Sequence, residues 1–235
     1  MKDIVKAIEA EQEYIQLNLQ GEQPNIHDFL DTWGYSNLEE FHNDKVEYSL
    51  KHLDWEITSH PNIDIEFTEK YINNRLPGFM YSIGVENNPY AFVRNNYEHI
   101  AELENLGYTV IRFGYNTDNG LILSYDGDLR IYMVLPEEID ANAFTFLDKM
   151  KNYFVELGLN ATIDNNDIMV DGKKVCGSGG FFMNKMRIIV FQVTFSDHAD
   201  EIERICGETP KEPGFIPQNI LTAEQLKNKF LEWLQ

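Results

Sequence analysis

The sequence predicts an α+β protein, in which a mixed or antiparallel sheet packs against helices and follows a helical N-terminal extension. Three observations indicate this class. Apolar residues recur at helical spacing up to about residue 52. Short apolar runs separated by turn signals follow from about residue 62. Two further helical patterns, at 137–157 and 222–234, lie among or after the strands.

The length and composition favour one large domain with a smaller appendage. The chain has 235 residues, of which 43% are hydrophobic and 13% aromatic, so it can bury a substantial core. We expect a helical extension at 1–60 and the main domain at 61–235.

The charge of the chain bears on its partners. Nineteen Lys and Arg residues stand against 39 Asp and Glu, and the formal net charge is −20. Such a chain repels nucleic-acid phosphates and anionic lipids at long range. We therefore expect neither nucleic acid nor a membrane as a partner, and any basic binding site must be local.

The sequence favours the cytoplasm as the compartment. The N-terminus, Met1-Lys2-Asp3-Ile4-Val5-Lys6, lacks the apolar core of a signal peptide, and the chain has no apolar run of about 18 residues that would span a bilayer. The two cysteines, Cys176 and Cys206, are too few for a disulfide framework or a metal cluster. A reducing compartment is expected.

The extension contains three helical patterns. An amphipathic helix is expected over 2–19 and ends before Pro24. A shorter helix follows over about 25–33. Ser36-Asn37-Leu38-Glu39 is a capping box that begins a third helix, which reaches about His52.

The middle of the chain has the pattern of short strands and one helix. The turn signals Leu76-Pro77-Gly78 and Glu86-Asn87-Asn88-Pro89 separate the first runs. The expected strands are 63–65, 79–85, 91–93, 108–113, 121–123 and 129–135, and the expected helix, 96–106, ends at Gly107. A polar loop, 114–120, that presents backbone amides is therefore expected between two buried strands.

The C-terminal part begins with a long helix at 137–157, which has one apolar face. A hairpin and a strongly apolar strand at 186–195 follow it. A helix ending at Cys206 and a proline-rich surface loop at 208–219 precede the terminal helix. The helices are expected to pack on one side of the strands.

The segment Asn165–Gly180 carries the clearest chemical signal. Asp171-Gly172 is the dipeptide that closes a two-residue hairpin. The return strand begins with Lys173 and Lys174 and runs into Gly177-Ser178-Gly179-Gly180, where a ligand can approach the backbone closely. A lysine held on a strand beside exposed amides is a place for an anion.

The same segment resembles a known family. The run from Asn166 to Gly179, Asn-Asp-Ile-Met-Val-Asp-Gly-Lys-Lys-Val-Cys-Gly-Ser-Gly, resembles a motif of lipoate-protein ligases, which biotin-protein ligases share more loosely. The resemblance implies that Lys174, not Lys173, contacts the acyl-adenylate. It covers roughly 75–235 and implies the α+β fold of these ligases.

A second stretch resembles the end of the family's glycine-rich nucleotide loop. Gly120 takes the place of the last loop glycine and Ser124 that of a histidine. The stretch departs from the family pattern, because Asp118 and Asn119 occupy glycine positions and Arg112 is the one nearby arginine.

The resemblance implies an ATP-dependent ligase for lipoate or a similar medium-chain or biotin-like acid. The acid would pass through an acyl-adenylate to a lysine of a lipoyl or biotinyl acceptor domain. Lys174 would be catalytic, and Asp167 could hold Mg²⁺. The residues expected to bind substrate or nucleotide are Arg112, Gly120, Ser124, Asn166, Gly177 and Ser178.

Two alternatives stay open. Octanoyltransferases resemble these ligases and combine the strand lysine with a cysteine nucleophile, for which Cys206 lies at a suitable distance beyond Lys174. Cys176 is instead expected to serve packing. The second alternative is a catalytically inactive protein that keeps the ligase fold as a binding or scaffold module, which the altered glycine loop permits.

Overall fold

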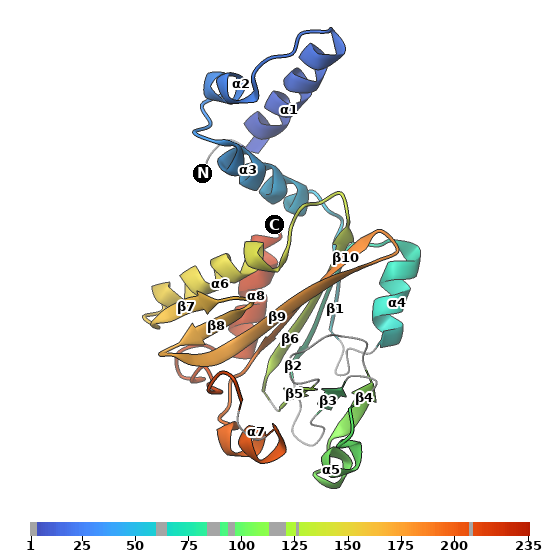
Figure 1. Cartoon of the computed structure of the whole chain (residues 1–235), viewed down its shortest axis with the longest axis vertical. Helices are drawn as coiled ribbons and strands as arrows, with labels where there is room; N and C mark the ends of the chain where they lie inside the picture. Colours follow the sequence, from blue (N-terminus) through green and yellow to red (C-terminus); the bar gives the residue numbers. More distant parts are fainter. Residues whose placement is uncertain are drawn as a thin grey trace. The chain divides into compact units, whose positions relative to one another are not determined.

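The computed structural model describes residues 4–59, 65–83, 90–93, 97–112, 121–125, 127–206 and 209–235. Its contacts divide the chain into two compact units (Figure 1). The first comprises Met1–Asp54, Glu138–Ala141 and Leu231–Gln235, and the second comprises Trp55–Glu137 and Asn142–Phe230.

The first unit contains three helices, as expected: α1 (Ile4–Leu19), α2 (Ile26–Thr32) and α3 (Leu38–Lys51). Asparagine side chains cap two of them. Asn25 accepts from the backbone N–H of His27 at 2.9 Å, and Asn37 accepts from that of Glu40 at 2.8 Å. The expected capping box of Ser36 and Glu39 is thus displaced by one residue, because Asn37 is the N-cap and the carboxylate of Glu40 accepts from the backbone N–H of Ser36 at 2.8 Å. The helices bury a small core of Ala7, Ala10, Phe29, Leu30 and Tyr35.

The second unit contains the strands and the other helices. Its helices are α4 (Ile65–Asn74), α5 (Ile100–Asn105), α6 (Ala143–Glu156), α7 (Ala199–Cys206) and α8 (Ala223–Trp233, whose last residues belong to the first unit). Its strands are β1 (Glu56–Ser59), β2 (Gly78–Ile83), β3 (Tyr90–Val93), β4 (Thr109–Arg112), β5 (Leu121–Ser124), β6 (Leu129–Pro136), β7 (Ala161–Asp164), β8 (Asp167–Val170), β9 (Lys173–Met183) and β10 (Met186–Val193).

The strands form two sheets in the described part of the chain. A seven-stranded sheet has the order β1-β2-β6-β10-β9-β8-β7, and a three-stranded sheet has the order β4-β3-β5. The large sheet is mixed, because β1 runs parallel to β2 while its other pairs are antiparallel. The predicted α+β class with a mixed sheet is confirmed.

Helices cover both faces of the large sheet. On one face, Phe146 of α6 and Phe230 of α8 pack on Phe191 of β10, with ring centroids 6.2 and 5.5 Å from that of Phe191. On the other face, Tyr71 and Ile72 of α4 pack on a cluster that includes residues of β2, β6 and β10. Figure 1 shows α6 and α8 to the left of α4.

The position of α4 corrects two expectations. Ile65 was expected in a strand, but it begins this helix, and the helices do not pack on one side alone. The alternation of Ile65 and Phe67 with acidic residues suggests a strand, but the spacing of four residues from Phe67 to Tyr71 and of seven from Ile65 to Ile72 is that of a helix face. Both of those side chains are at most 1% exposed.

We expect Gly78→Ala to destabilise the second unit. A Cβ at Gly78 would lie 2.6 Å from Cδ1 of the buried Tyr71 ring, so the ring or β2 must shift. Overpacking of this kind costs about 1–3 kcal/mol in the free energy of unfolding. Denaturant unfolding measures the loss. Gly179→Ala is the control, because its Cβ would meet no described atom within 4 Å. Equal stability of the two variants would contradict the prediction.

Within the described ranges, none of the helices is both long and apolar enough to cross a membrane.

Candidate functional site

The predicted hairpin around Asp171-Gly172 is present. Both residues have positive φ, 51° and 81°, as a two-residue hairpin turn with Asp-Gly requires. The turn joins β8 to β9, and a second short turn at Asn165–Asn166 joins β7 to β8. The segment that carries the chemical signal is therefore built from two successive hairpins.

A β-bulge decides which lysine faces the site. Along β8, Ile168 pairs with Cys176 but Met169 pairs with Lys174, so Val175 is the extra residue on β9. Because of this extra residue, Lys174 shares a face of the sheet with Gly177, whereas Lys173 shares the opposite face with Cys176.

Lys174 makes an ion pair on that face. Its Nζ lies 3.0 Å from Oδ1 of Asp167, and its side chain is 42% exposed against 15% for Asp167. A Cβ at Gly177 would lie 3.5 Å from Nζ of Lys174, so the bare backbone of Gly177 lies beside the ammonium group. Lys173 instead pairs with Glu212, whose hydrogen bond raises the pKa of Lys173.

A second lysine completes the cluster. Nζ of Lys211 lies 2.7 Å from Oδ2 of Asp167 and 3.0 Å from Oδ2 of Asp164, and it donates to the carbonyl of Asp164 at 2.8 Å. Partial burial lowers the pKa of Lys211, but the bonds to Asp167 and Asp164 outweigh it and raise that pKa overall. Two lysines thus share the carboxylate of Asp167.

The loop at 208–219 was expected at the surface, but part of it pairs with β9. The backbone N–H of Lys174 donates to the carbonyl of Glu212 at 2.8 Å, and that of Gly214 donates to the carbonyl of Lys174 at 2.9 Å. Ile216 is 0% exposed. A Cβ at Gly214 would lie 2.6 Å from Cβ of Lys173, so this close approach requires glycine.

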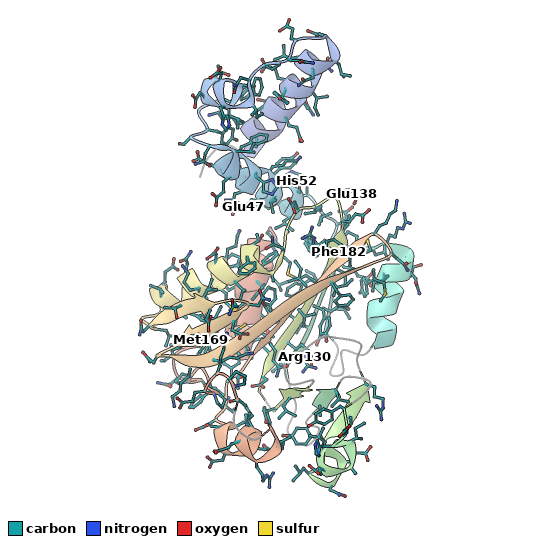
Figure 2. The ribbon with its side chains drawn as sticks, in the orientation of Figure 1. Glu47, His52, Arg130, Glu138, Met169 and Phe182 are labelled. Carbon is teal, nitrogen blue, oxygen red and sulfur yellow. The ribbon has the colours of Figure 1, made fainter. Side chains whose placement is uncertain are left out.

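A row of paired residues, most of them polar, crosses the sheet from Gly177; we call it the polar row. Gly177 pairs with Gln192 of β10, which pairs with Arg130 of β6, which pairs with Ser82 of β2. Directly paired residues point to one face, so this row lies on the face of Lys174. Figure 2 labels Arg130 on β6 and Met169 on β8.

Gln192 joins the two sheets. Nη2 of Arg130 donates to Oε1 of Gln192 at 2.8 Å, and Nε2 of Gln192 donates to the carbonyl of Leu123 in β5. Arg130 is only 5% exposed. The link connects β5 of the small sheet to Gln192, the strand partner of Gly177.

Asp128, which is 1% exposed, directly precedes β6 and fixes the start of that strand by two hydrogen bonds. Its Oδ2 accepts from the backbone N–H of Tyr125 at 3.2 Å, and its Oδ1 accepts from that of Phe195 at 3.0 Å. Burial raises the pKa of Asp128 to about 7, although the two N–H donors and the charge of Arg130 act to lower it.

Beside the polar row the sheet face becomes apolar. Gly179 pairs with Val190, which pairs with Tyr132, and a Cβ at Gly179 would meet no described atom within 4 Å. The face therefore offers the ammonium group of Lys174 near Gly177 and bare backbone with an aliphatic neighbour at Gly179. A ligand with an anionic head and an apolar chain matches this arrangement.

The structure brings Asn166 and Ser178 together. The hydroxyl of Ser178 donates to the carbonyl of Asn166 at 2.7 Å, and its backbone N–H donates to the same carbonyl at 2.9 Å. Both residues thus fasten the β7–β8 turn to β9. Binding of a substrate or nucleotide by Asn166 and Ser178 stays a prediction.

Two of the three residues expected from the nucleotide loop, Arg112 and Ser124, lie on the small sheet. Arg112 ends β4 opposite Val93, at the end of the sheet where Leu121 also lies, whereas Ser124 ends β5 opposite Tyr90 at the other end. Ser124 follows Leu123, whose carbonyl Gln192 contacts. Gly120 and the side chain of Ser124 lie outside the described part of the chain.

The two cysteines differ. Cys176 is 1% exposed, and burial raises the pKa of its thiol, as befits the expected packing role. Cys206 is the last residue of α7, and its side chain lies outside the described part of the chain. The transferase alternative stays a prediction.

Asp167 does not offer a ready metal site. Both of its carboxylate oxygens accept from ammonium groups, those of Lys174 and Lys211. Among the residues that the structure describes, no group of three or more His, Cys, Asp and Glu side chains could hold a metal ion. The Mg²⁺ role of Asp167 therefore stays a prediction.

Sequence reasoning missed three polar residues of this face: Arg130, Gln192 and Lys211. Arg130 and Gln192 carry a weak local signal, since each is a polar residue within a strongly apolar strand pattern. Lys211 carries none, because it reaches Asp167 from 44 positions further along the chain.

Comparisons with known proteins establish the fold. Lipoate-protein ligase A, solved bound with ATP, aligns with a TM-score of 0.59 and 13% identity over 77% of this chain and 83% of its own. LipL1 of P. falciparum, solved in complex with lipoate, aligns with a TM-score of 0.58 and 13% identity over 76% of this chain and 60% of its own.

A lipoate protein ligase from Thermoplasma acidophilum, part of a bi-partite archaeal system and described with its E2 lipoyl domain, aligns with a TM-score of 0.57 and 13% identity over 77% of this chain and 82% of its own. No family model matches the chain, and no curated protein matches it in sequence. The expected resemblance to lipoate-protein ligases is confirmed at the level of the fold.

Proposed function

We propose that this chain, which has the fold of the lipoate-protein ligases, activates lipoate or a similar medium-chain acid with ATP and transfers the acyl group to a lysine of an acceptor domain. The observation that carries the proposal is the position of Lys174. Because of the bulge at Val175, the ammonium group of Lys174 lies beside the bare backbone of Gly177. The same face of the sheet becomes apolar towards Gly179.

The first half-reaction joins the acid to AMP. A carboxylate oxygen attacks the α-phosphorus of ATP, the bond to the β-phosphate oxygen breaks, and pyrophosphate leaves. Carboxylate and phosphate meet as like charges, so a fixed cation beside them lowers the barrier. In this proposal Lys174 supplies that charge. The structural neighbour bound with ATP supports the nucleotide as co-substrate.

The acyl chain would lie along the sheet towards Gly179 and Val190. An aliphatic chain gains by burial on apolar surface, at about 0.8 kcal/mol per buried CH₂ group. The side chains of β9 leave room there, because Gly177 and Gly179 have none. This placement sets the head of the acid beside Lys174.

The second half-reaction passes the acyl group to an acceptor. A neutral lysine amine of a lipoyl-type carrier domain attacks the acyl carbon to form an amide, AMP leaves with the bonding electron pair, and the amine releases a proton to solvent. The archaeal neighbour, described with its E2 lipoyl domain, supports an acceptor of this class. The exchange experiment described next decides between this ligase and the inactive scaffold.

The test is ATP–pyrophosphate exchange driven by a carboxylic acid. We expect exchange with lipoate or octanoate, and biotin tests the looser resemblance. The absence of exchange with all three acids would refute the ligase and favour the inactive scaffold. Mass spectrometry after incubation with octanoyl carrier protein tests the transferase, because a covalent acyl adduct on Cys206 is its necessary intermediate.

We expect Gly179→Val to weaken binding of the acid without unfolding the protein. The backbone of Gly179 does not adopt positive φ, and its side-chain direction is open among described atoms. The branched side chain would occupy the path of the acyl chain and raise KM for the acid about tenfold. Exchange kinetics measure KM, and Gly179→Ala should give an intermediate value. An unchanged KM in both variants would contradict this path.

A further inference from the structure

Asp167 serves two lysines at once. Its Oδ1 faces Nζ of Lys174 at 3.0 Å, and its Oδ2 faces Nζ of Lys211 at 2.7 Å. The two lysines differ in exposure, 42% for Lys174 and 22% for Lys211. Lys174 is therefore the more accessible member of the trio, and Lys211 the more enclosed one.

Hydrogen bonds fix the backbone on both sides of Lys211 in the sequence. The hydroxyl of Thr209 donates to the carbonyl of Lys211 at 2.8 Å. The residue after Lys211, Glu212, accepts from the backbone N–H of Lys174 at 2.8 Å, and Gly214 donates to the carbonyl of Lys174 at 2.9 Å. The backbone that carries Lys211 is thus hydrogen-bonded to the strand that carries Lys174.

The ion pair with Asp167 opposes the task proposed for Lys174. A substrate anion must draw the ammonium group of Lys174 away from Asp167. A carboxylate that is only 15% exposed would then lose a partner, and leaving a largely buried charge unpaired is costly. Lys211 removes that cost, because it keeps Asp167 paired after Lys174 has moved to the substrate.

We propose that Lys211 is a positioning residue, which retains Asp167 so that Lys174 can exchange this carboxylate for the anionic head of the substrate. The proposal rests on the proposed function, since it takes the acyl-adenylate as the incoming anion. Lys211 itself does not touch the substrate in this account. Asp164 fixes Lys211 from the other side, with its carbonyl and carboxylate.

The experiment measures binding of a stable acyl-adenylate mimic, an acyl-sulfamoyl adenosine, by calorimetry without ATP or Mg²⁺. Lys211→Met should weaken binding about tenfold, because Asp167 then retains Lys174 as its one partner. Lys211→Gln should do the same. Lys211→Arg, which keeps the charge, should stay within about threefold of the unsubstituted protein.

A double variant separates positioning from a merely structural role. Asp167→Asn in the Lys211→Met background removes the competing carboxylate, so binding should return to within about threefold of the unsubstituted protein. Lys173→Met is the matched control on the same strand and should bind normally, because Lys173 pairs with Glu212 instead. Denaturant unfolding confirms that each variant is folded before binding is compared.

Each outcome bears on a distinct claim. If the unsubstituted protein binds and both Lys211→Met and Lys211→Gln bind equally well, the role of Lys211 is wrong and the proposed function stands. If Lys211→Met binds weakly and the Asp167→Asn substitution does not restore binding, Lys211 acts other than through Asp167. If the unsubstituted protein binds no acyl-sulfamoyl adenosine, the proposed function fails and this inference fails with it.

Discussion

Replacing Lys174 by alanine is expected to lower acid-dependent ATP–pyrophosphate exchange at least about 100-fold, the usual loss when one preorganised charge-stabilising group is removed. The physical reason is that the meeting of carboxylate and α-phosphate loses its fixed cation. The stability of the protein should change by less than about 1 kcal/mol, because the side chain is 42% exposed and Asp167 keeps Lys211 as a partner.

Lys173→Ala is the matched control for this prediction. Lys173 is the adjacent lysine on β9, is 51% exposed and pairs with Glu212, so its loss removes a similar charge from the same strand. Exchange should stay within about threefold of the unsubstituted protein. Retained exchange in Lys174→Ala, or equal losses in both variants, would refute the assignment of Lys174.

The second large effect is a pH-dependent contribution of Asp128 to stability. The pKa of this carboxyl is raised to about 7 in the folded protein from its ordinary value of 3.8. The folded state therefore binds the proton more tightly than the unfolded state does between these two values. The contribution is fully present below about pH 4, falls as the pH rises and is lost once the pH has passed about 7.

The variant Asp128→Asn isolates this contribution, because asparagine does not titrate. We expect the unfolding free energy of the unsubstituted protein, minus that of Asp128→Asn, to fall by at most about 4 kcal/mol from pH 4 to pH 8. At low pH the variant should be the less stable, since the amide cannot accept from both backbone N–H groups that Asp128 holds.

Denaturant unfolding at a series of pH values measures both quantities. The other acidic groups of this chain titrate in both proteins, so the difference cancels their common part. A difference that stays constant from pH 4 to pH 8 would show that Asp128 is ionised throughout. In that case the two N–H donors and Arg130 outweigh the effect of burial.

The fold was largely predictable because its signals are local. The apolar spacing of the extension and Asp171-Gly172 in the hairpin act within a few residues. The cap of α3 differs by one residue, because Asn37 and not Ser36 accepts the capping hydrogen bond. The helix α4 was missed because its first residues alternate like a strand. Its buried side chains, Tyr71 and Ile72, find their partners on distant strands.

The sequence by itself determined the acidic charge, the α+β class, the hairpin and a pair of lysines beside bare glycine backbone. The choice of Lys174 over Lys173 came from a resemblance, and only the tertiary structure supplies its physical reason, the extra residue at Val175. A bulge depends on how two strands pair, which no single stretch encodes.

The tertiary structure alone decided what surrounds Lys174. Strand register sets Gln192 and Arg130 in line with Gly177, and a distant segment brings Lys211 to Asp167. These contacts join residues far apart in the chain, so no local pattern records them. Lys174 therefore shares its carboxylate partner, Asp167, with Lys211. Substitution of Lys211 tests how Lys174 is released from Asp167 to bind a substrate.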